Sequence, residues 1–312
     1  MRMRKQILVI GGTYFAGRVF SILTSRGDSG RDDLDLHVVN RGRFPLNNLQ
    51  HVTQYVCDRH ESEKLVSMLP DGLVFDAVVD FCAYEPGEIR ALTDALAGRF
   101  RQYIYLSTCT VYAPASGCLS ETEPVIENFG SSPEFEYAGK KYALEQELIS
   151  ACGAAGIPYT ILRPAFIYGP FNYAPRESFY AKLIAAGQPV PVPTDASGRF
   201  SFVYVYDVSA IINRCLGNEK ACDCVFNLAA PEIVDYTSFL DTFRQCYGSD
   251  FPTYPVTVRQ VIEQNIPLPF PLDEDQLYSG KRAEELLDFA YTPFATGMKK
   301  TVELLKDLYP AK

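Results

Sequence analysis

Residues 6–17, QILVIGGTYFAG, decide the fold. The apolar run at 7–10 predicts a buried strand, and the glycine pair that follows predicts a tight turn leading into a helix. A helix N-terminus carries unpaired N–H groups and a partial positive charge, and glycine lets a phosphate approach the backbone closely. The stretch therefore predicts a phosphate-binding turn between a strand and a helix.

One position of this turn is unusual. Gly11, Tyr14 and Gly17 stand at the three glycine positions of a GxxGxxG pattern, so a tyrosine replaces the middle glycine. We expect the phenol of Tyr14 to lie against whatever the turn binds. A glycine turn that binds nothing remains the alternative at this point.

Composition excludes several classes of protein. The 312 residues are 47% hydrophobic and 21% charged, the net charge is −9, and no apolar run approaches the length of a membrane helix. The acidic balance argues against a dedicated nucleic-acid binder, and the basic start lacks a signal-peptide cleavage site. The nine cysteines are scattered, and Cys222-Asp-Cys224 has no histidine near it. We expect a cytoplasmic protein with reduced thiols, no metal site and no membrane segment.

Strands and helices alternate about five times in the first hundred residues. The expected strands are 36–39, 52–56, 77–81 and 103–106, and the expected helices are 16–26, 61–69 and 86–97. A longer helix over 134–152 and a strand over 159–162 follow. This alternation predicts an α/β fold with a doubly wound parallel sheet, whose ligands bind beyond the carboxyl ends of the strands.

The end of the second strand bears on cofactor choice. An acid there usually binds the ribose 2′-OH of NAD, whereas a cation suits the 2′-phosphate of NADP. Here the position holds Asn40, followed by Arg41 and Arg43. The pattern favours NADP slightly, and two solvated loop arginines are an equally weighted alternative.

Tyr137 and Lys141 lie four residues apart on the expected helix 134–152, so their side chains share one face. A lysine cation stabilises a phenolate, and lowering the phenol pKa to near 7 would take ~4 kcal/mol. The pair could then move a proton on and off an alcohol. Thr108, at the end of strand 103–106, could hydrogen-bond the same oxygen. Alone, such a pair is usually a surface feature; beside the glycine turn it gains weight.

These motifs together resemble those of the extended short-chain dehydrogenase/reductases, the NAD-dependent epimerase/dehydratase family. The resemblance covers nearly the whole chain. Its motifs are GGTYFAG at 11–17, LSTCTVY at 106–112, Tyr137 with Lys141, LRP at 162–164, IYGP at 167–170 and FVYVYDV at 202–208. Tyr14 and the arginines after Asn40 resemble an atypical branch that includes isomerases and plastid RNA-associated proteins.

The resemblance implies a Rossmann-like domain over residues 1–165, with 200–230 returning to it, and a smaller C-terminal α/β substrate-binding part from 166–199 and 231–312. It implies a homodimer formed through helices near 86–97 and 134–152. It assigns catalysis to Thr108, Tyr137 and Lys141. The cofactor-binding residues it implies are Gly11, Thr13, Tyr14, Phe15, Gly17, Asn40, Arg41, Asp58, Cys82, Ala83, Lys141 and Pro164. The substrate-binding residues are Tyr84, Cys109, Thr110, Phe166 and Arg199.

Departures from the family pattern limit which reactions and substrates of the family we expect for this chain. Dehydratases of the family carry Asp and Glu directly after the catalytic threonine, where this chain has Cys109 and Thr110. The epimerases usually bind a diphosphate with Asn at the position of Phe166, and with Arg at the position of Phe200, one residue from Arg199. The substrate could therefore be a nucleotide sugar or another sugar-like alcohol.

The sequence leaves three functions open. The first is an NAD(P)-dependent epimerase in which tyrosine is the general acid–base and nicotinamide shuttles the hydride. The second is an NADPH-dependent carbonyl reductase. The third is a non-catalytic protein that senses a dinucleotide or associates with RNA.

Overall fold

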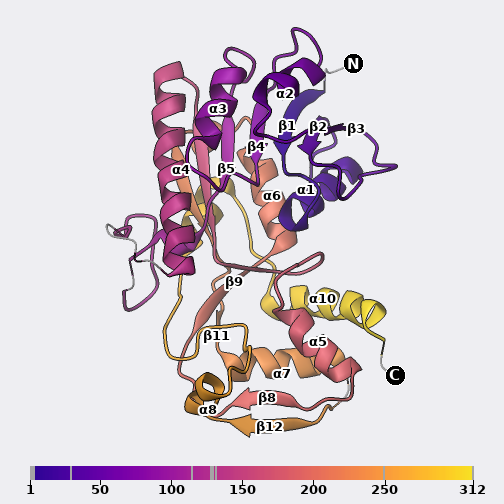
Figure 1. Cartoon of the computed structure of the whole chain (residues 1–312), viewed down its shortest axis with the longest axis vertical. Helices are drawn as coiled ribbons and strands as arrows, with labels where there is room; N and C mark the ends of the chain where they lie inside the picture. Colours follow the sequence, from indigo (N-terminus) through magenta and orange to yellow (C-terminus); the bar gives the residue numbers. More distant parts are fainter. Residues whose placement is uncertain are drawn as a thin grey trace.

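A seven-stranded parallel sheet forms the centre of the upper part of the molecule in the computed structural model (Figure 1). The structure describes residues 4–28, 30–113, 115–126, 130, 132–248 and 250–310. The sheet has the order β10-β6-β5-β4-β1-β2-β3. Its strands are β1 (Lys5–Ile10), β2 (Leu34–Asn40), β3 (Val52–Val56), β4 (Ala77–Asp80), β5 (Tyr103–Leu106), β6 (Tyr159–Pro164) and β10 (Cys224–Leu228). The predicted doubly wound α/β fold is confirmed.

Alternating side chains of β1 reach both faces of this sheet. Ile7 and Val9 belong to a core that includes α1 (Phe15–Arg26) and α6 (Val205–Cys215). Leu8 and Ile10 belong to a second core. That core includes residues of α2 (Ser62–Met68), α3 (Glu88–Ala95) and α4 (Pro133–Ala155). β1 is therefore buried on both sides, which explains its nearly continuous apolar sequence.

The strand order reverses between β1 and β4, since the chain runs from β1 to β2 on one side and reaches β4 on the other. In an open parallel sheet such a reversal leaves a crevice at the carboxyl ends of the two strands. The glycine turn after β1 opens at this crevice, so the topology places the site.

The lower part of the molecule contains two small sheets and several helices (Figure 1). The sheets have the orders β11-β9-β7 and β12-β8. Their strands are β7 (Phe166–Tyr168), β8 (Val190–Pro193), β9 (Phe200–Tyr204), β11 (Ile233–Val234) and β12 (Thr253–Val256). The helices of this part are α5 (Glu177–Ala185), α7 (Tyr236–Tyr247), α8 (Val258–Glu263) and α10 (Phe294–Leu308). The remaining helix, α9 (Lys281–Leu287), packs against α6 and β10 of the upper part, and short 3₁₀ turns lie at Cys109–Val111 and Glu219–Ala221.

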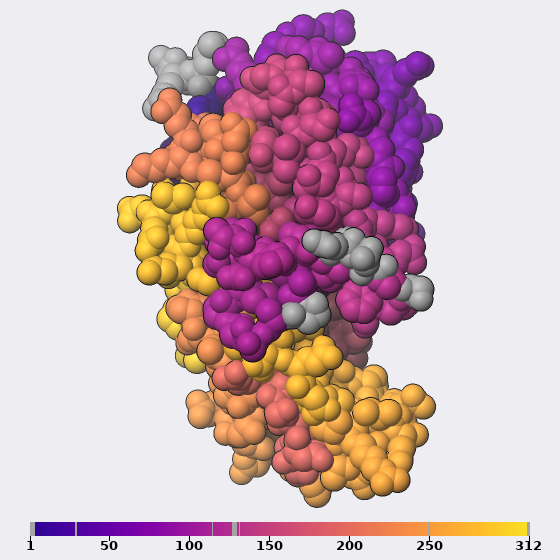
Figure 2. Space-filling view, turned by 90° about the vertical axis from the view of Figure 1, so that its left-hand side faces the viewer, coloured from indigo at the N-terminus to yellow at the C-terminus, as the bar shows by residue number. Residues whose placement is uncertain are grey.

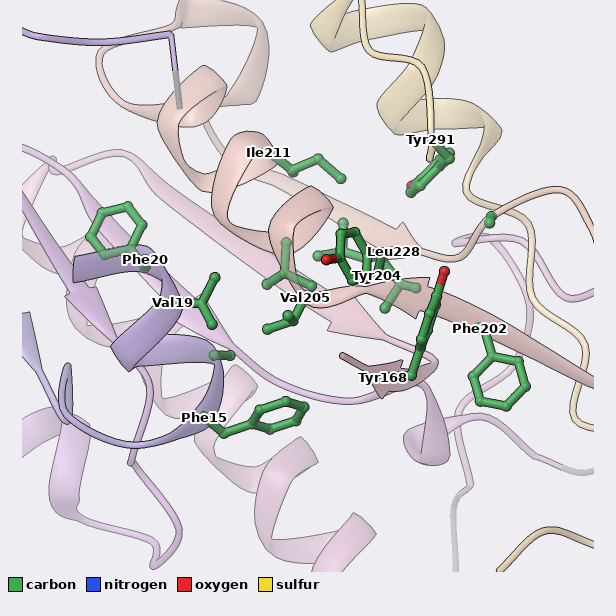
Figure 3. Packing of buried hydrophobic residues seen from close by; sticks show 14 of the residues in the cluster. Phe15, Val19, Phe20, Tyr168, Phe202, Tyr204, Val205, Ile211, Leu228 and Tyr291 are labelled. Carbon is green, nitrogen blue, oxygen red and sulfur yellow. The ribbon is translucent and has the colours of Figure 1, made fainter. Parts of the chain in front are cut away.

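Aromatic side chains join the upper and lower parts. Figure 3 shows Phe15 and Val19 of α1 on one side of Val205, with Tyr168 and Phe202 beyond it. All of them are members of one continuous buried cluster. The first turn of α1 is thereby tied to β7 and β9 of the lower part.

Two proline-containing strands depart from the sequence-based expectation. The stretches 187–198 and 251–272 look like loops because of their prolines, yet they contain β8, VPVP, and β12, TYPV. The two strands pair only with each other. Each is therefore an edge strand, where a missing N–H is tolerated.

One side of the molecule presents α4 at the surface, seen in pink in Figure 2. α4 packs against α3, and these are the two helices through which we predict dimerisation. Dimerisation remains a prediction. None of the described helices is both long and apolar enough to cross a bilayer.

Candidate active site

The turn after β1 needs its glycines for space and for backbone conformation. Gly11 has a positive φ of 87°, and a Cβ there would lie 2.8 Å from the Cys82 sulfur beyond β4. A Cβ on Gly17 would lie 2.6 Å from the carbonyl oxygen of Gly11. The first and third glycines therefore let α1 begin directly against the strand ends, as a phosphate-binding helix must.

Tyr14 occupies an ordinary extended conformation, with φ −134° and ψ 139°, so this position does not demand glycine. Its ring stacks between the rings of Phe44 and Tyr173. The centroid distances are 5.2 Å to Phe44 and 5.0 Å to Tyr173. Tyr14 thus lines the cavity as the middle of a three-ring aromatic stack.

The end of β2 carries one orphaned donor and two cations. Asn40 accepts hydrogen bonds on Oδ1 from the Gly42 N–H (2.7 Å) and from Gln54 Nε2 (3.1 Å). Its buried Nδ2 has no partner among the described residues. Arg41 and Arg43 line the same end of the cavity, and neither forms an ion pair within the described part of the chain. This edge can donate to a ribose hydroxyl or to an anion.

A buried ion pair between Arg59 and Asp80 lies beside the cavity, at the end of β4. Asp80 is fully buried at the end of β4, and Arg59 donates to both of its oxygens at 2.9 and 3.0 Å. Burial alone would raise the pKa of Asp80, but the Arg59 guanidinium lowers it below its usual value. Tyr103 and the Cys82 N–H also donate to Asp80. Sequence analysis missed this pair, although an acid ending the apolar strand AVVD was its signal.

Asp58, predicted at the cofactor site, also lines the cavity. Its Oδ1 accepts the His60 N–H at 3.0 Å and pairs with His60 Nδ1 at 2.7 Å. These hydrogen bonds lower the pKa of Asp58. His60 Nε2 in turn meets Glu88 at 2.6 Å, which fixes the loop after β3.

Lys141 is buried, with a 2% exposed surface, and its ammonium is held by the backbone. Nζ donates to the carbonyl oxygens of Leu106 (2.7 Å) and Ala83 (3.2 Å). It also lies 4.4 Å from the ring centroid of Tyr105 and 5.1 Å from that of Tyr84. Burial lowers the pKa of Lys141 to about 8. The predicted catalytic lysine is thus fixed between the ends of β4 and β5.

Tyr137 lies one helical turn before Lys141 and is 41% exposed. Burial of its hydroxyl in the cavity raises its pKa to about 12, with a further increase from Tyr173 and a decrease from Arg176. The expected lowering by Lys141 is not observed, because the ammonium is turned toward two carbonyl oxygens. A phenolate here would need a further positive charge beside it.

Thr108 lies at the cavity wall after β5, and its hydroxyl contacts the Thr110 hydroxyl at 3.0 Å and accepts the Thr110 N–H at 3.2 Å. Cys109 is 1% exposed, and its thiol donates to the carbonyl oxygen of Arg163. Burial raises the pKa of the Cys109 thiol well above its usual value. Neither Cys109 nor Thr110 can therefore supply the carboxylic acid chemistry of a dehydratase.

A second buried network, unforeseen from the sequence, holds this strand end. Ser107 donates to Glu145 of α4 at 2.5 Å, and Arg163 of β6 donates to both Glu145 oxygens at 2.9 and 2.5 Å. The network links β5, β6 and α4, the elements that carry Thr108, Pro164 and the Tyr137–Lys141 pair. It orients the helix on the sheet: Ser107 also lines the cavity, whereas Glu145 and Arg163 are not among the lining residues.

The substrate end differs from the sequence-based expectation. Phe166 lines the cavity, with the guanidinium of Arg176 over its ring at 4.7 Å from the centroid. Arg199 does not line the cavity: it is half exposed and pairs with Asp275. The suggested recruitment of Arg199 is therefore not supported. Arg176 occupies the wall instead, and sequence analysis missed it.

One cavity of about 630 Å³ collects these groups. Among the predicted residues, it is lined by Gly11, Thr13, Tyr14, Phe15, Gly17, Asn40, Arg41, Asp58, Cys82, Tyr84, Thr108, Cys109, Thr110, Tyr137, Lys141, Pro164 and Phe166. Ala83 lies behind the wall, fully buried, and acts through its carbonyl oxygen. The glycine turn and the predicted catalytic residues therefore face one space.

The comparisons with known proteins agree with this fold. Residues 87–229 match the model of the NAD dependent epimerase/dehydratase family. This stretch of the chain, a little under half of it, resembles the family. It is 23% identical over 237 residues to UDP-glucose 4-epimerase of Vibrio cholerae, covering 72% of this chain and 70% of that protein. The epimerase/dehydratase fold is also seen in NAD-bound dTDP-glucose 4,6-dehydratase of Bacillus anthracis, with a TM-score of 0.78, 17% identity and 97% of each chain covered.

Another relative is not named as an enzyme. The chain is 30% identical over 263 residues to a chloroplast stem-loop binding protein of Arabidopsis thaliana. The match covers 80% of this chain and 65% of that protein, so the chain spans about two thirds of the relative's length. This likeness agrees with the predicted resemblance to the atypical branch of the epimerase/dehydratase family.

Proposed function

We propose that this protein is an NAD(P)-dependent epimerase that acts on a hydroxyl group of a sugar-like substrate, with nucleotide sugars as the first class to test. One observation carries the proposal: Thr108, Tyr137 and Lys141 face the same cavity as the glycine turn. The residues after Thr108 cannot replace the acids of a dehydratase, which favours epimerisation over dehydration.

The residues of the cavity suit a dinucleotide. The N-terminus of α1 and the close packing of Gly11 and Gly17 would take the pyrophosphate. The unpartnered Asn40 amide would donate to the adenosine ribose, and Lys141 would hold the nicotinamide ribose. Arg41 and Arg43 support binding of NADP at least as well as NAD, and titration of the protein with the two dinucleotides measures that preference.

The chain's own groups would manage the proton. Thr108 would hydrogen-bond the substrate hydroxyl, and Tyr137 would accept its proton. A bound oxidised nicotinamide supplies a hydride acceptor and a positive charge. A positive charge beside Tyr137 would lower the pKa of the phenol, which burial raises to about 12. For the return step, Tyr137 would give the proton back to the oxygen.

Tyr137→Phe tests this function. The variant removes the hydroxyl alone, so we expect turnover to fall by about 10²- to 10⁴-fold while dinucleotide affinity stays within about twofold. The measurement is conversion of UDP-glucose, UDP-galactose and UDP-glucuronic acid by the NAD-loaded protein, followed by NMR of the products. Stoichiometric NADPH consumption without epimer formation would indicate a reductase. Unchanged turnover in the variant would refute the role of Tyr137.

A second candidate, RNA binding, is favoured by the likeness to the chloroplast stem-loop binding protein. The net charge of −9 opposes it. RNA binding depends steeply on salt, because phosphate contacts release counterions. Filter binding of a stem-loop RNA at low and physiological salt separates the two candidates: retention that disappears with salt supports RNA binding, and no retention at low salt eliminates it.

A further inference from the structure

Arg176 ends the loop 169–176 at the start of α5 and forms part of the cavity wall. Its Nη1 donates to the carbonyl oxygen of Ile167 at 3.0 Å, and its guanidinium stacks on Phe166. A guanidinium has five N–H donors, and this is the one hydrogen bond that the Arg176 side chain makes to a described residue. Most of its donors are therefore open to a ligand.

Three other arginines of the region are neutralised by carboxylates. Arg59 pairs with Asp80, Arg163 with Glu145 and Arg199 with Asp275. Arg176 forms no ion pair with any residue that the structure describes. Its sequence neighbour Glu177 is 1% exposed and accepts instead from Asn172 at 2.9 Å. A positive charge without a carboxylate is therefore held at the substrate end of the cavity.

This charge is poorly solvated. Burial lowers the pKa of Arg176 below its ordinary value, although Glu177 opposes the shift. Taking a cation out of water without a partner costs free energy, and an anion that enters the cavity would offset that cost. Planar guanidinium groups suit carboxylate and phosphate oxygens, because they can donate two parallel hydrogen bonds.

The position of Arg176 indicates which part of a substrate it would meet. Arg176 and Tyr137 line the same cavity, close enough for the guanidinium to lower the pKa of the phenol. The group that Arg176 meets would thus lie near the carbon on which Tyr137 works. The diphosphate of a nucleotide sugar is attached at the opposite end of the sugar ring from a C4 hydroxyl.

We infer that Arg176, seated on Phe166, is a specificity-determining residue that binds a carboxylate or phosphate carried by the substrate beside its reacting carbon. The inference rests on the proposed function for the identity of that carbon. It makes an acidic sugar, rather than a neutral one, the preferred substrate class. Phe166 would then position the guanidinium through its aromatic ring. It stands where the related epimerases usually have a diphosphate-binding asparagine.

Matched ligands test the inference by binding, without turnover. Calorimetry of the NAD-loaded protein would compare UDP-glucuronic acid with UDP-glucose, which differ in the carboxylate at C6, and glucose 6-phosphate with glucose. The wild-type protein should bind at least one acidic ligand about 10- to 100-fold more tightly than its neutral partner. Arg176→Met should abolish that ratio, and Arg176→Lys should restore part of it. The uronic and phosphate pairs distinguish the two sources of charge.

Arg199→Met is the matched control, because it removes a guanidinium that lies outside the cavity. It should leave the acidic-to-neutral ratio unchanged. Equal weakening of UDP-glucose and UDP-glucuronic acid in Arg176→Met would place Arg176 at the diphosphate and overturn the inference. An unchanged ratio in that variant, or no preference for either acidic ligand in the wild-type protein, would overturn it too. Thermal melting of each variant checks folding, and the ratio within one variant does not depend on its stability.

The proposed function and this inference can fail separately. An absence of epimer formation by the wild-type protein would remove the epimerase assignment and leave the measured acidic preference standing. A neutral preference in the wild-type protein would remove the role of Arg176 and leave the epimerase assignment intact.

Discussion

Lys141 and Arg176 are two cations in the wall of one cavity, and the protein treats them differently. Neither forms an ion pair with a carboxylate in the described parts of the chain. Lys141 donates to two backbone carbonyl oxygens and lies near the rings of Tyr84 and Tyr105. Arg176 has one carbonyl oxygen and one ring. The backbone therefore accepts hydrogen bonds from most of the Lys141 ammonium. Most donors of the Arg176 guanidinium have no such acceptor, and a ligand could supply it.

The difference follows from the elements that carry the two residues. Lys141 projects from the 23-residue helix α4, which Glu145 and Arg163 pin to the sheet. Arg176 stands at the end of the loop 169–176, in which Tyr173 stacks on Tyr14. A group that must act on every substrate in the same way suits the rigid helix, whereas a group that selects among substrates suits a loop.

The largest expected effect is that of Lys141→Met. Removing the ammonium should lower turnover of whichever panel sugar the wild-type protein converts by about 10²- to 10⁴-fold. It should also weaken dinucleotide binding, because the proposed contact to the ribose is lost. Steady-state kinetics and dinucleotide titration measure both quantities.

Lys140→Met is the control for that variant. Lys140 is the neighbouring residue, but it points to the surface side of α4 and pairs with Glu85 and Glu136 at 2.9 Å. Its loss should change turnover by less than about twofold, because surface ion pairs contribute little. Equal losses in the two variants would mean that helix stability, rather than the buried ammonium, explains the result.

An intermediate effect concerns stability beside Arg176. Burial raises the pKa of Glu177 to about 7, and its Oε1 has no hydrogen-bond partner among the described residues. The folded state thus holds this proton more tightly than the unfolded chain. The stabilisation is complete below about pH 4.5 and is lost as pH rises through 7, by about 3 kcal/mol for this group.

Glu177→Gln should remove that slope. The amide oxygen can still accept from Asn172, and no charge has to be buried. Relative to the variant, the free energy of unfolding of the wild-type protein should therefore fall between about pH 4.5 and 7. Denaturant unfolding of both proteins across this range measures the difference. A constant difference would show that Glu177 titrates as it does in water.

The sequence predicts the cofactor half of the cavity better than the substrate half, and the comparison of the two cations explains why. The glycine turn spans seven residues, and Tyr137 and Lys141 are one helical turn apart, so local spacing determines their geometry. Arg176 is positioned in the cavity wall by its contact with Phe166, on the other side of a loop. Arg199 is held outside the cavity by Asp275, which lies 76 positions further along the chain. Such contacts depend on tertiary packing that local pattern does not specify.

The same reasoning covers the fold. Six of the seven strands of the central sheet lie within residues 5–164 and most of them are apolar, so their existence and order of appearance can be predicted from the sequence. β8 and β12 contain prolines and pair with each other 63 positions apart, as Val190 with Thr253. A proline in a short stretch of sequence predicts a loop. Proline is tolerated in an edge strand, but whether a strand lies at an edge is known only once its pairing strand is known.

The smallest effect should come from Tyr173→Ala, which tests whether the two halves of the cavity are coupled. Tyr173 lies on the loop of Arg176, yet its ring stacks on Tyr14 at the start of α1. An aromatic pair of this kind contributes about 0.5–1.5 kcal/mol, so the dissociation constant of NAD should rise about 2- to 10-fold. Tyr254→Ala, on the distant β12, should leave NAD binding unchanged. If Tyr173→Ala weakens binding of the acidic sugar and leaves NAD binding unchanged, the loop positions Arg176 alone. The stack of Tyr173 on Tyr14 would then support substrate binding and not cofactor binding.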